Sequence, residues 1–231
     1  KSARSHRPIT LKLRLSEEEI ARFAVDRWRY PGVDLIPYFS RVYPYGDLFA
    51  HIVGYVGRVD AKDRERLDET AAAFSHIGKT GLERYYEDTL RGKVGYERIE
   101  TNSDGRAIRT LGTVPATPGA DLRLSIDVDL QRAMVAAFGE LEGTAVAVDP
   151  RNGEILGMVS LPSYNPNLFV NGISHADYKA LNDNPSRPQF NRAVLGGVAP
   201  GSTIKPILGL AGLDSGTRRP EDKTLSTGMF Y

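Results

Sequence analysis

The side chains with the clearest chemical potential lie in one short run of the sequence. Ser202 and Lys205 stand three residues apart in Pro200-Gly201-Ser202-Thr203-Ile204-Lys205-Pro206. Side chains at this spacing share one face of a helix, so the lysine amine can take the proton of the serine hydroxyl. This arrangement activates a serine nucleophile without a histidine. The amine accepts a proton only when it is neutral, and burial or a second cation favours the neutral form.

The Ser-x-x-Lys pattern is short, so an ordinary amphipathic helix with Ser202 at its N-cap and Lys205 exposed is the competing interpretation. Two neighbouring features favour a site. Pro200-Gly201 predicts a tight entry into the helix, and the apolar run from Ile207 to Leu213 predicts that the helix is buried. A lysine at the start of a buried helix needs a functional reason.

Composition excludes several other kinds of chemistry. The 231 residues are enough for one or two domains, and the absence of cysteine excludes thiol catalysis, disulfides and cysteine-ligated zinc. The net charge of +1 gives no basic surplus for nucleic acid, and we expect no nucleic-acid partner. The four histidines lack metal-ligand spacing, so we expect no metal and no cofactor: His6, His51, His76 and His175.

The elements expected upstream of Ser202 form a mixed pattern. Residues 121–126 alternate like a strand, and Asp127 is predicted to cap a helix that runs to Phe138 and ends at Gly139. Residues 145–160 predict a hairpin whose strands are apolar enough to be covered on both faces. Residues 161–201 read as a long irregular stretch, which in a compact domain is usually functional.

The first half of the chain predicts shorter elements. Ser16 and Glu19 form a capping box for a helix over residues 16–24. Further predictions are an exposed helix over 60–70, a helix over 81–90, and a hairpin of 96–101 with 106–111. The tyrosine-rich stretch from Tyr30 to Tyr55 could stack on nucleic acid, but its few basic residues favour a core and an interface. The best domain boundary is Pro115–Gly119.

Several runs resemble the class B penicillin-binding proteins. Residues 145–206 are similar to the first third of a penicillin-binding transpeptidase domain, on the strength of the 145–160 hairpin, Pro162–Asn167, Asn191-Arg192-Ala193 and Pro200–Pro206. Residues 78–86 and 90–97 resemble the non-catalytic pedestal of these proteins. Residues 20–25, 30–33 and 43–46 look most like their elongation-specific Gram-negative branch.

The resemblance implies an α+β fold in two parts. Residues 1–118 would form a strand-rich, irregular pedestal or dimerisation domain. Residues 119–231 would begin a transpeptidase domain of the β-lactamase-like serine acyltransferase type. The family uses two further motifs, Ser-x-Asn and Lys-[Ser/Thr]-Gly, after the nucleophile. Because 29 residues follow Ser202, we expect this chain to be a fragment and to be inactive alone.

Two runs match the sequences of these later motifs, but at positions before the nucleophile, where the family does not have them. Ser163-Tyr164-Asn165 precedes the nucleophile, and Lys79-Thr80-Gly81 lies in the expected pedestal. We assign both to structure.

The activity implied by the resemblance is peptidoglycan D,D-transpeptidation in cell elongation, with Ser202 as nucleophile and Lys205 as general base. Stem peptides would be substrates, and β-lactams would acylate the same serine. A membrane glycosyltransferase and elongation proteins would bind the pedestal, at the periplasmic face of an inner membrane, with an N-terminal membrane anchor outside this chain. The alternatives are a D,D-carboxypeptidase, a β-lactam sensor, or a non-catalytic pedestal acting as an interaction module.

Overall fold

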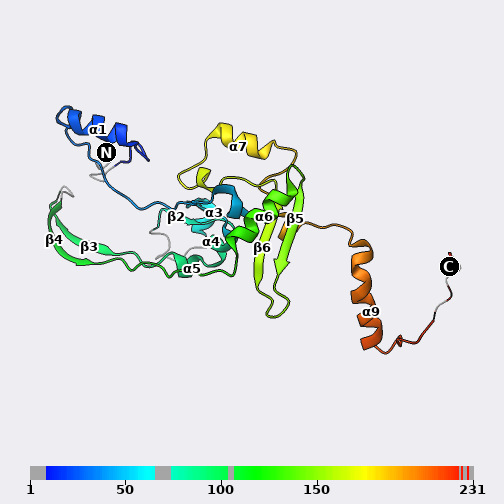
Figure 1. Ribbon diagram of the computed structural model, residues 1–231. Helices are drawn as coiled ribbons and strands as arrows, with labels where there is room; N and C mark the ends of the chain where they lie inside the picture. Colours follow the sequence, from blue (N-terminus) through cyan, green and yellow to red (C-terminus); the bar gives the residue numbers. More distant parts are fainter. Residues whose placement is uncertain (1–8, 66–73, 104–106, 224, 226–227, 229–231) are drawn as a thin grey trace. The chain divides into compact units, whose positions relative to one another are not determined.

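The computed structural model describes residues 9–65, 74–103, 107–223, 225 and 228 (Figure 1). Contacts divide the chain into a first unit, 1–194, and a second unit, 195–231. The boundary predicted between residues 118 and 119 falls inside the first unit and stays a prediction. None of the helices in the described ranges is both long and apolar enough to cross a membrane.

The first helix forms as its capping box predicts. Helix α1 (Glu17–Asp26) begins after Ser16, whose hydroxyl accepts the Glu19 N–H at 3.2 Å, and the Glu19 carboxylate accepts the Ser16 N–H at 3.0 Å. A short 3-10 helix, η1 (Arg27–Arg29), follows. No residue of α1 is buried among the described residues.

Short elements make up the middle of the first unit. They are η2 (Gly46–Phe49), α2 (Ala50–Val53), β1 (Val56–Arg58), α3 (Ala61–Arg64), β2 (His76–Gly78), α4 (Gly81–Tyr85) and α5 (Glu87–Leu90). Strands β1 and β2 pair antiparallel. Asp60 caps α3, and the rest of the helix predicted to residue 70 lies outside the described residues. The single helix predicted over 81–90 is instead two short helices with a break at Tyr86.

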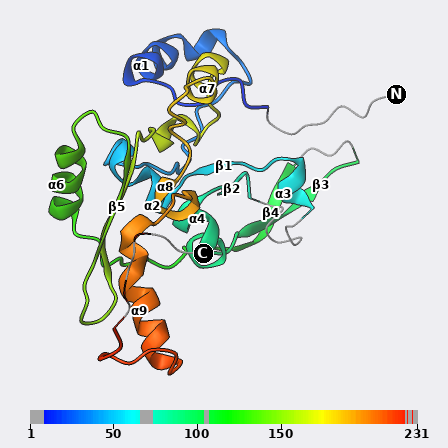
Figure 2. The same ribbon diagram turned by 90° about the vertical axis from the view of Figure 1, so that its right-hand side faces the viewer.

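The first predicted hairpin is confirmed. Strands β3 (Tyr96–Thr101) and β4 (Ala107–Val114) pair antiparallel, with two irregularities in register. The predicted turn falls partly on residues 104–106, outside the described residues. Figure 2 shows the two strands side by side, and almost every residue of this hairpin is exposed.

The second hairpin and its helix also form. Helix α6 (Val128–Phe138) begins at Asp127, whose carboxylate accepts the N–H groups of Asp129 and Leu130 at 2.9 Å. It ends at Gly139, where φ is +55°. Strands β5 (Gly143–Val148) and β6 (Ile155–Leu161) pair antiparallel, and α6 packs on one face of this sheet (Figure 2).

Three predictions about this region are wrong. Residues 121–126 form no strand: their bond to β6 comes from a side chain, Ser125 Oγ to the Ile155 carbonyl, and the first backbone bond to β6 comes after them, from the Asp127 N–H to the Leu156 carbonyl. The β5–β6 sheet is covered on one face rather than two, because no described element packs over Val146 and Val148, which are exposed. The stretch 161–201 is not wholly irregular: it contains η4 (Pro166–Leu168), α7 (His175–Asn182) and α8 (Arg192–Leu195).

The core of the first unit joins residues from both halves of the chain. Ala50, Tyr164 and Phe169 are buried together, and the rings of Tyr55 and Phe169 stack with centroids 4.2 Å apart. The tyrosine-rich stretch is therefore divided: Tyr43 and Tyr55 pack inside, whereas Tyr30 and Phe39 are 51% and 106% exposed. The second unit contains η5 (Gly201–Ile204) and α9 (Lys205–Asp214) in its described part.

Candidate active site

Ser202 and Lys205 lie on one continuous helical segment. Ser202 is in η5, and Lys205 is the first residue of α9, where its N–H donates to the Ser202 carbonyl. In a 3-10 turn, side chains three residues apart are eclipsed, so both functional groups leave the same side of the helix. Gly201 opens the turn with φ at +54°, a backbone conformation that glycine adopts without strain.

The serine and the lysine are both exposed, and no hydrogen bond to the Ser202 hydroxyl is present among the described residues. The hydroxyl of neighbouring Thr203 is occupied, because it donates to the Pro200 carbonyl. The segment thus offers a free hydroxyl near an amine at the start of a helix. These are the two groups that the Ser-x-x-Lys prediction requires on one face of a helix.

The prediction that this helix is buried is wrong for the described structure. No residue of α9 is buried, and the side chains of Ile207 and Leu210 are 61% and 66% exposed. The physical reason is that the described part of the second unit has no second layer, only η5 and α9, against which an apolar helix could pack.

The two runs that match the later motifs, Lys79-Thr80-Gly81 and Ser163-Tyr164-Asn165, have structural roles. Lys79 forms ion pairs with Asp60, at 3.0 Å, and with buried Asp63. The Asp63 N–H and then the Lys79 ammonium lower the pKa of Asp60 to about 2. Ser163 donates to the Asp47 carbonyl at 2.8 Å, and Asn165 caps η4 by accepting the Asn167 N–H at 3.0 Å.

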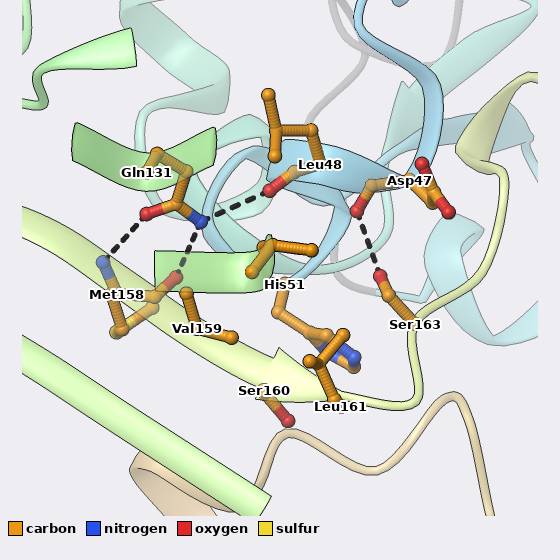
Figure 3. Close-up of a pocket in the computed structure, with 10 residues that line it drawn as sticks. Asp47, Leu48, His51, Gln131, Met158, Val159, Ser160, Leu161 and Ser163 are labelled. Atoms are coloured by element: carbon orange, nitrogen blue, oxygen red, sulfur yellow. Dashed lines mark hydrogen bonds between the residues drawn. The ribbon is translucent and has the colours of Figure 1, made fainter. Parts of the chain in front are cut away.

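A buried glutamine links α6 to two other elements. Gln131 is 1% exposed, and its Nε2 donates to the carbonyls of Leu48 at 3.1 Å and Met158 at 2.8 Å. Its Oε1 accepts the Met158 N–H at 2.9 Å. Figure 3 shows this side chain between Leu48 and Met158, with Ser163 pointing to Asp47. These residues line a cavity of about 50 Å³.

Four such contacts form what we call the central interface. Each joins a backbone carbonyl of residues 43–51 to a polar side chain from residues 131–191. The pairs are Tyr43 with Asn167 at 2.9 Å, Asp47 with Ser163 at 2.8 Å, Leu48 with Gln131 at 3.1 Å, and His51 with Asn191 at 2.9 Å. Asn167 also accepts the Tyr43 N–H at 2.9 Å. Residues 43–51 are therefore held through their backbone.

A network of Arg41, Tyr43 and Glu83 also contacts the start of residues 43–51. Glu83 is buried and accepts the guanidinium of Arg41, with Nε to Oε1 at 2.8 Å, and the hydroxyl of Tyr43 at 3.2 Å. The Tyr43 hydroxyl in turn accepts the Val56 N–H at 2.8 Å. Burial, and then the negative charge of Glu83, raise the pKa of Tyr43. The phenol therefore stays protonated and can donate to the carboxylate.

The described residues hold no group of three or more His, Asp or Glu side chains suited to a metal ion. His51 and His76 are partly buried, and desolvation lowers the pKa of each. His6 lies outside the described residues, and His175 begins α7.

Sequence reasoning missed Gln131, Asn167 and Asn191. Gln131 falls next to Leu130 on the apolar face predicted for α6, and a polar residue on that face signals a buried hydrogen-bonding role. Asn167 and Asn191 lie in two runs that carry the family resemblance, Pro162–Asn167 and Asn191-Arg192-Ala193, but the resemblance assigned no contact to either side chain.

Comparison with protein-family models gives two matches. The Penicillin-binding Protein dimerisation domain matches residues 1–124, and the Penicillin binding protein transpeptidase domain matches residues 143–230. Together they cover most of the chain, in the order that the sequence resemblance predicts.

Curated relatives are similar over nearly the whole chain. A peptidoglycan D,D-transpeptidase MrdA of Haemophilus influenzae is 45% identical over 228 residues, which cover 96% of this chain and 35% of the relative. The protein of the same name from Escherichia coli K12 is 46% identical over 221 residues, covering 93% and 35%. Penicillin-binding protein 3 of Bacillus subtilis is 39% identical, covering 87% and 29%. The chain spans about a third of the length of these relatives.

Solved structures of penicillin-binding proteins are also similar to this chain. Pseudomonas aeruginosa PBP2, in complex with WCK 5153, matches with a TM-score of 0.74 and 43% identity, covering 86% of this chain and 40% of that one. Helicobacter pylori PBP2, in complex with MreC, matches with a TM-score of 0.77 and 31% identity, covering 89% and 38%.

Proposed function

Because this chain belongs to the penicillin-binding proteins, we propose that it carries the nucleophile segment and part of the pedestal of an elongation-specific peptidoglycan D,D-transpeptidase. Ser202 is the nucleophile and Lys205 the general base. The domain division at residues 118/119 belongs to the same proposal. The observation that carries it is the pair of exposed side chains on one helical turn, at the start of α9, inside the range of the transpeptidase family match.

The reaction proceeds in two balanced steps. Ser202 Oγ attacks the carbonyl carbon of the penultimate D-Ala of a stem peptide, and Lys205 Nζ takes the hydroxyl proton. The peptide C–N bond breaks, the leaving D-Ala amine receives the proton, and a serine ester remains. An amine of a neighbouring stem peptide then attacks the ester carbonyl carbon and loses a proton to Lys205. The ester C–O bond breaks, Ser202 Oγ receives that proton from Lys205, and the new amide is the cross-link.

The position of Ser202 in the first turn supports this role. Negative charge on its oxygen is favoured by the N-terminal end of the helical segment. A β-lactam carbonyl presents the same electrophile, so a β-lactam would acylate Ser202 and leave a stable ester.

Water as the acceptor would give the alternative activity, a D,D-carboxypeptidase. A β-lactam sensor would also use a serine ester. The pedestal favours the transpeptidase over both, because a hydrolase or a sensor needs no such domain. It also favours partners of the elongation machinery, such as the MreC bound by the Helicobacter pylori relative. We place the protein at the periplasmic face of an inner membrane.

The deciding experiment uses a protein in which this sequence continues into the Ser-x-Asn and Lys-[Ser/Thr]-Gly motifs (the extended protein). With Ser202→Ala, covalent labelling by a fluorescent penicillin should be lost while the circular dichroism spectrum is retained. With Lys205→Ala, labelling should slow by about 10²–10⁴-fold, because the proton acceptor is lost. Undiminished labelling of folded Ser202→Ala would refute the assignment of the nucleophile.

A further inference from the structure

Asn152 and Gly153 form an Asn-Gly pair at the tip of the β5–β6 hairpin, and both residues are exposed. Asn152 Oδ1 accepts the Glu154 N–H at 3.0 Å, and Asn152 Nδ2 donates to a Glu154 carboxylate oxygen, also at 3.0 Å. These two bonds fix the orientation of the side-chain amide. The ring of atoms that the Oδ1 bond closes contains both the Asn152 Cγ and the Gly153 nitrogen, so these two atoms belong to the same tight turn.

This geometry favours attack of the Gly153 nitrogen on the Asn152 Cγ. Attack places negative charge on Oδ1, and the Glu154 N–H already donates to that atom, as an oxyanion donor does in an enzyme. The nitrogen that must leave as ammonia, Nδ2, lies against the Glu154 carboxylate, which stabilises its protonated form. Gly153 has no Cβ, and an added one would meet nothing within 4 Å, so the turn has room around the reacting atoms.

One contact opposes the attack. The Gly153 N–H donates to the Asp149 carbonyl at 2.8 Å, and this bond must open before the nitrogen can react. Residues 150–154 are all exposed, and exposed hairpin tips open locally at low free energy. The contact therefore slows the attack without preventing it.

We propose that Asn152 is a site of spontaneous deamidation, with water as the co-reactant. The Gly153 nitrogen bonds to the Asn152 Cγ, and the proton that it loses passes through water to Nδ2. The Cγ–Nδ2 bond breaks, ammonia leaves, and a succinimide ring remains. A water molecule then adds to either ring carbonyl carbon, the bond from that carbon to the Gly153 nitrogen breaks, and the nitrogen regains a proton.

The product is aspartate or isoaspartate at position 152. Either product adds a negative charge to the β5–β6 turn, and isoaspartate also inserts a methylene group into the main chain between the two strands. The proposal is independent of the proposed function, because it concerns only the hairpin of the first unit.

A second Asn-Gly pair in the first unit allows a matched comparison. Asn171 is half-buried: its Oδ1 accepts the Tyr38 hydroxyl and its Nδ2 donates to the Ser40 hydroxyl, both at 3.5 Å. The Gly172 N–H donates to the Phe169 carbonyl at 3.1 Å, so the attacking nitrogen is bonded in both pairs. The difference lies in the side-chain amide, which at Asn171 is held against an earlier segment of the chain.

The first experiment follows both pairs in this chain during incubation at mildly alkaline pH, where the glycine nitrogen loses its proton more readily. Peptide mass spectrometry measures the conversion of amide to acid at each site, and a methyltransferase specific for isoaspartate identifies the rearranged product. Asn152 should deamidate about tenfold faster than Asn171, because two weak hydrogen bonds must break before Asn171 reacts. Equal rates, or a faster Asn171, would overturn the proposal.

The same incubation in urea shows whether the structure causes the difference. Both pairs then lie in an unfolded chain, so their rates should become similar. A difference of the same size in urea would assign the selectivity to the flanking sequence and overturn the argument from the turn.

Two variants test the contacts of the turn itself. Glu154→Gln keeps the N–H that donates to Oδ1 but removes the charge beside Nδ2, so deamidation at Asn152 should slow by about threefold while Asn171 keeps its rate. Asn152→Gln should abolish the conversion at this position, because its longer side chain closes a less favourable ring with the Gly153 nitrogen. An unchanged rate in Glu154→Gln would refute the role of the carboxylate, and conversion that persists in Asn152→Gln would refute the site.

Discussion

The central interface and the segment that carries Ser202 and Lys205 (residues 195–223) differ in how their side chains are buried and paired. In the central interface, four backbone carbonyls each accept a hydrogen bond from one side chain, and Gln131 is almost fully buried. In residues 195–223, no side chain of the helix that carries Lys205 is buried, and the Ser202 hydroxyl has no bonded partner among the described residues. The polar groups of the central interface are therefore paired, whereas the candidate nucleophile is unpaired within the described residues. Four measurements can break or sharpen this contrast.

The largest expected effect concerns acylation of this chain by itself. Mass spectrometry after incubation with a β-lactam should show an adduct at Ser202 at least about 10²–10³-fold more slowly than in the extended protein. One missing oxyanion donor alone has an effect of this size. If this chain and the extended protein acquired the adduct equally fast, residues 195–223 would be as complete as the central interface, and the contrast would be wrong.

The next effect tests the buried side of the comparison. Gln131→Ala should lower the free energy of unfolding of the first unit by about 3–5 kcal/mol, because the Leu48 and Met158 groups would lose three hydrogen bonds in a buried place. Urea denaturation measures this change. Gln189→Ala, the same substitution at an exposed residue, should stay within about 0.5 kcal/mol. Equal effects of the two variants would contradict the role given to Gln131.

Two glycines with positive φ allow the same substitution in each unit: Gly54, shortly after residues 43–51 of the central interface, and Gly201, at the start of η5. At Gly54, φ is +76° and an added Cβ would lie 2.0 Å from the Thr80 carbonyl oxygen, so Gly54→Ala should cost about 2–4 kcal/mol in unfolding free energy. At Gly201, an added Cβ meets nothing within 4 Å. Gly201→Ala should therefore strain only its own turn and leave the urea midpoint of the first unit unchanged. A shift of that midpoint would show that the two regions fold together.

The smallest effect is a pH dependence from the histidines near the central interface. Desolvation lowers the pKa of His51 below its usual 6.5, with the nearby Arg192 cation acting in the same direction, and desolvation lowers that of His76. Above pH 6.5 both are neutral in the folded and unfolded states. As the pH falls further, the unfolded chain takes up protons first, so stability is lost.

The measurement is urea denaturation between about pH 6.5 and 5.5, the range in which histidine titrates before most carboxylates. The double variant His51→Gln, His76→Gln should lose stability less steeply over this range than the unaltered chain. If the free energy of unfolding changed with pH equally in both proteins, groups other than His51 and His76 would be responsible for the change.

Local signals in the sequence predicted the local structure well. The capping box at Ser16, the Asp127 cap of α6, and both hairpins depend on residues close in sequence, and all are confirmed. The errors came from long-range packing. The strand predicted over 121–126 needed a partner along its length, and the burial predicted for α9 needed a second layer.

The candidate site divides in the same way. Ser202 and Lys205 were found from a spacing that one helical turn determines. The central interface was not, because its contacts join residues 83–140 positions apart, and no pattern within one element records such a pairing. The usable signs were the glutamine on an apolar helix face and the family resemblance of the runs that contain Asn167 and Asn191.

Since the central interface holds residues 43–51 mainly through carbonyl oxygens, which every amino acid has, its specificity lies almost wholly on the other side. A pedestal transplanted from a distant relative should therefore dock here whatever side chain it carries at the exposed position 47, provided that its backbone follows the same path and that its residues at positions 50 and 51 still pack against Tyr164. In such chimaeric proteins Gln131, Ser163, Asn167 and Asn191 would stay in place. In evolution, we therefore expect weaker constraint on the identity of residues that contribute only a carbonyl, such as Asp47, than on Gln131, Ser163, Asn167 and Asn191.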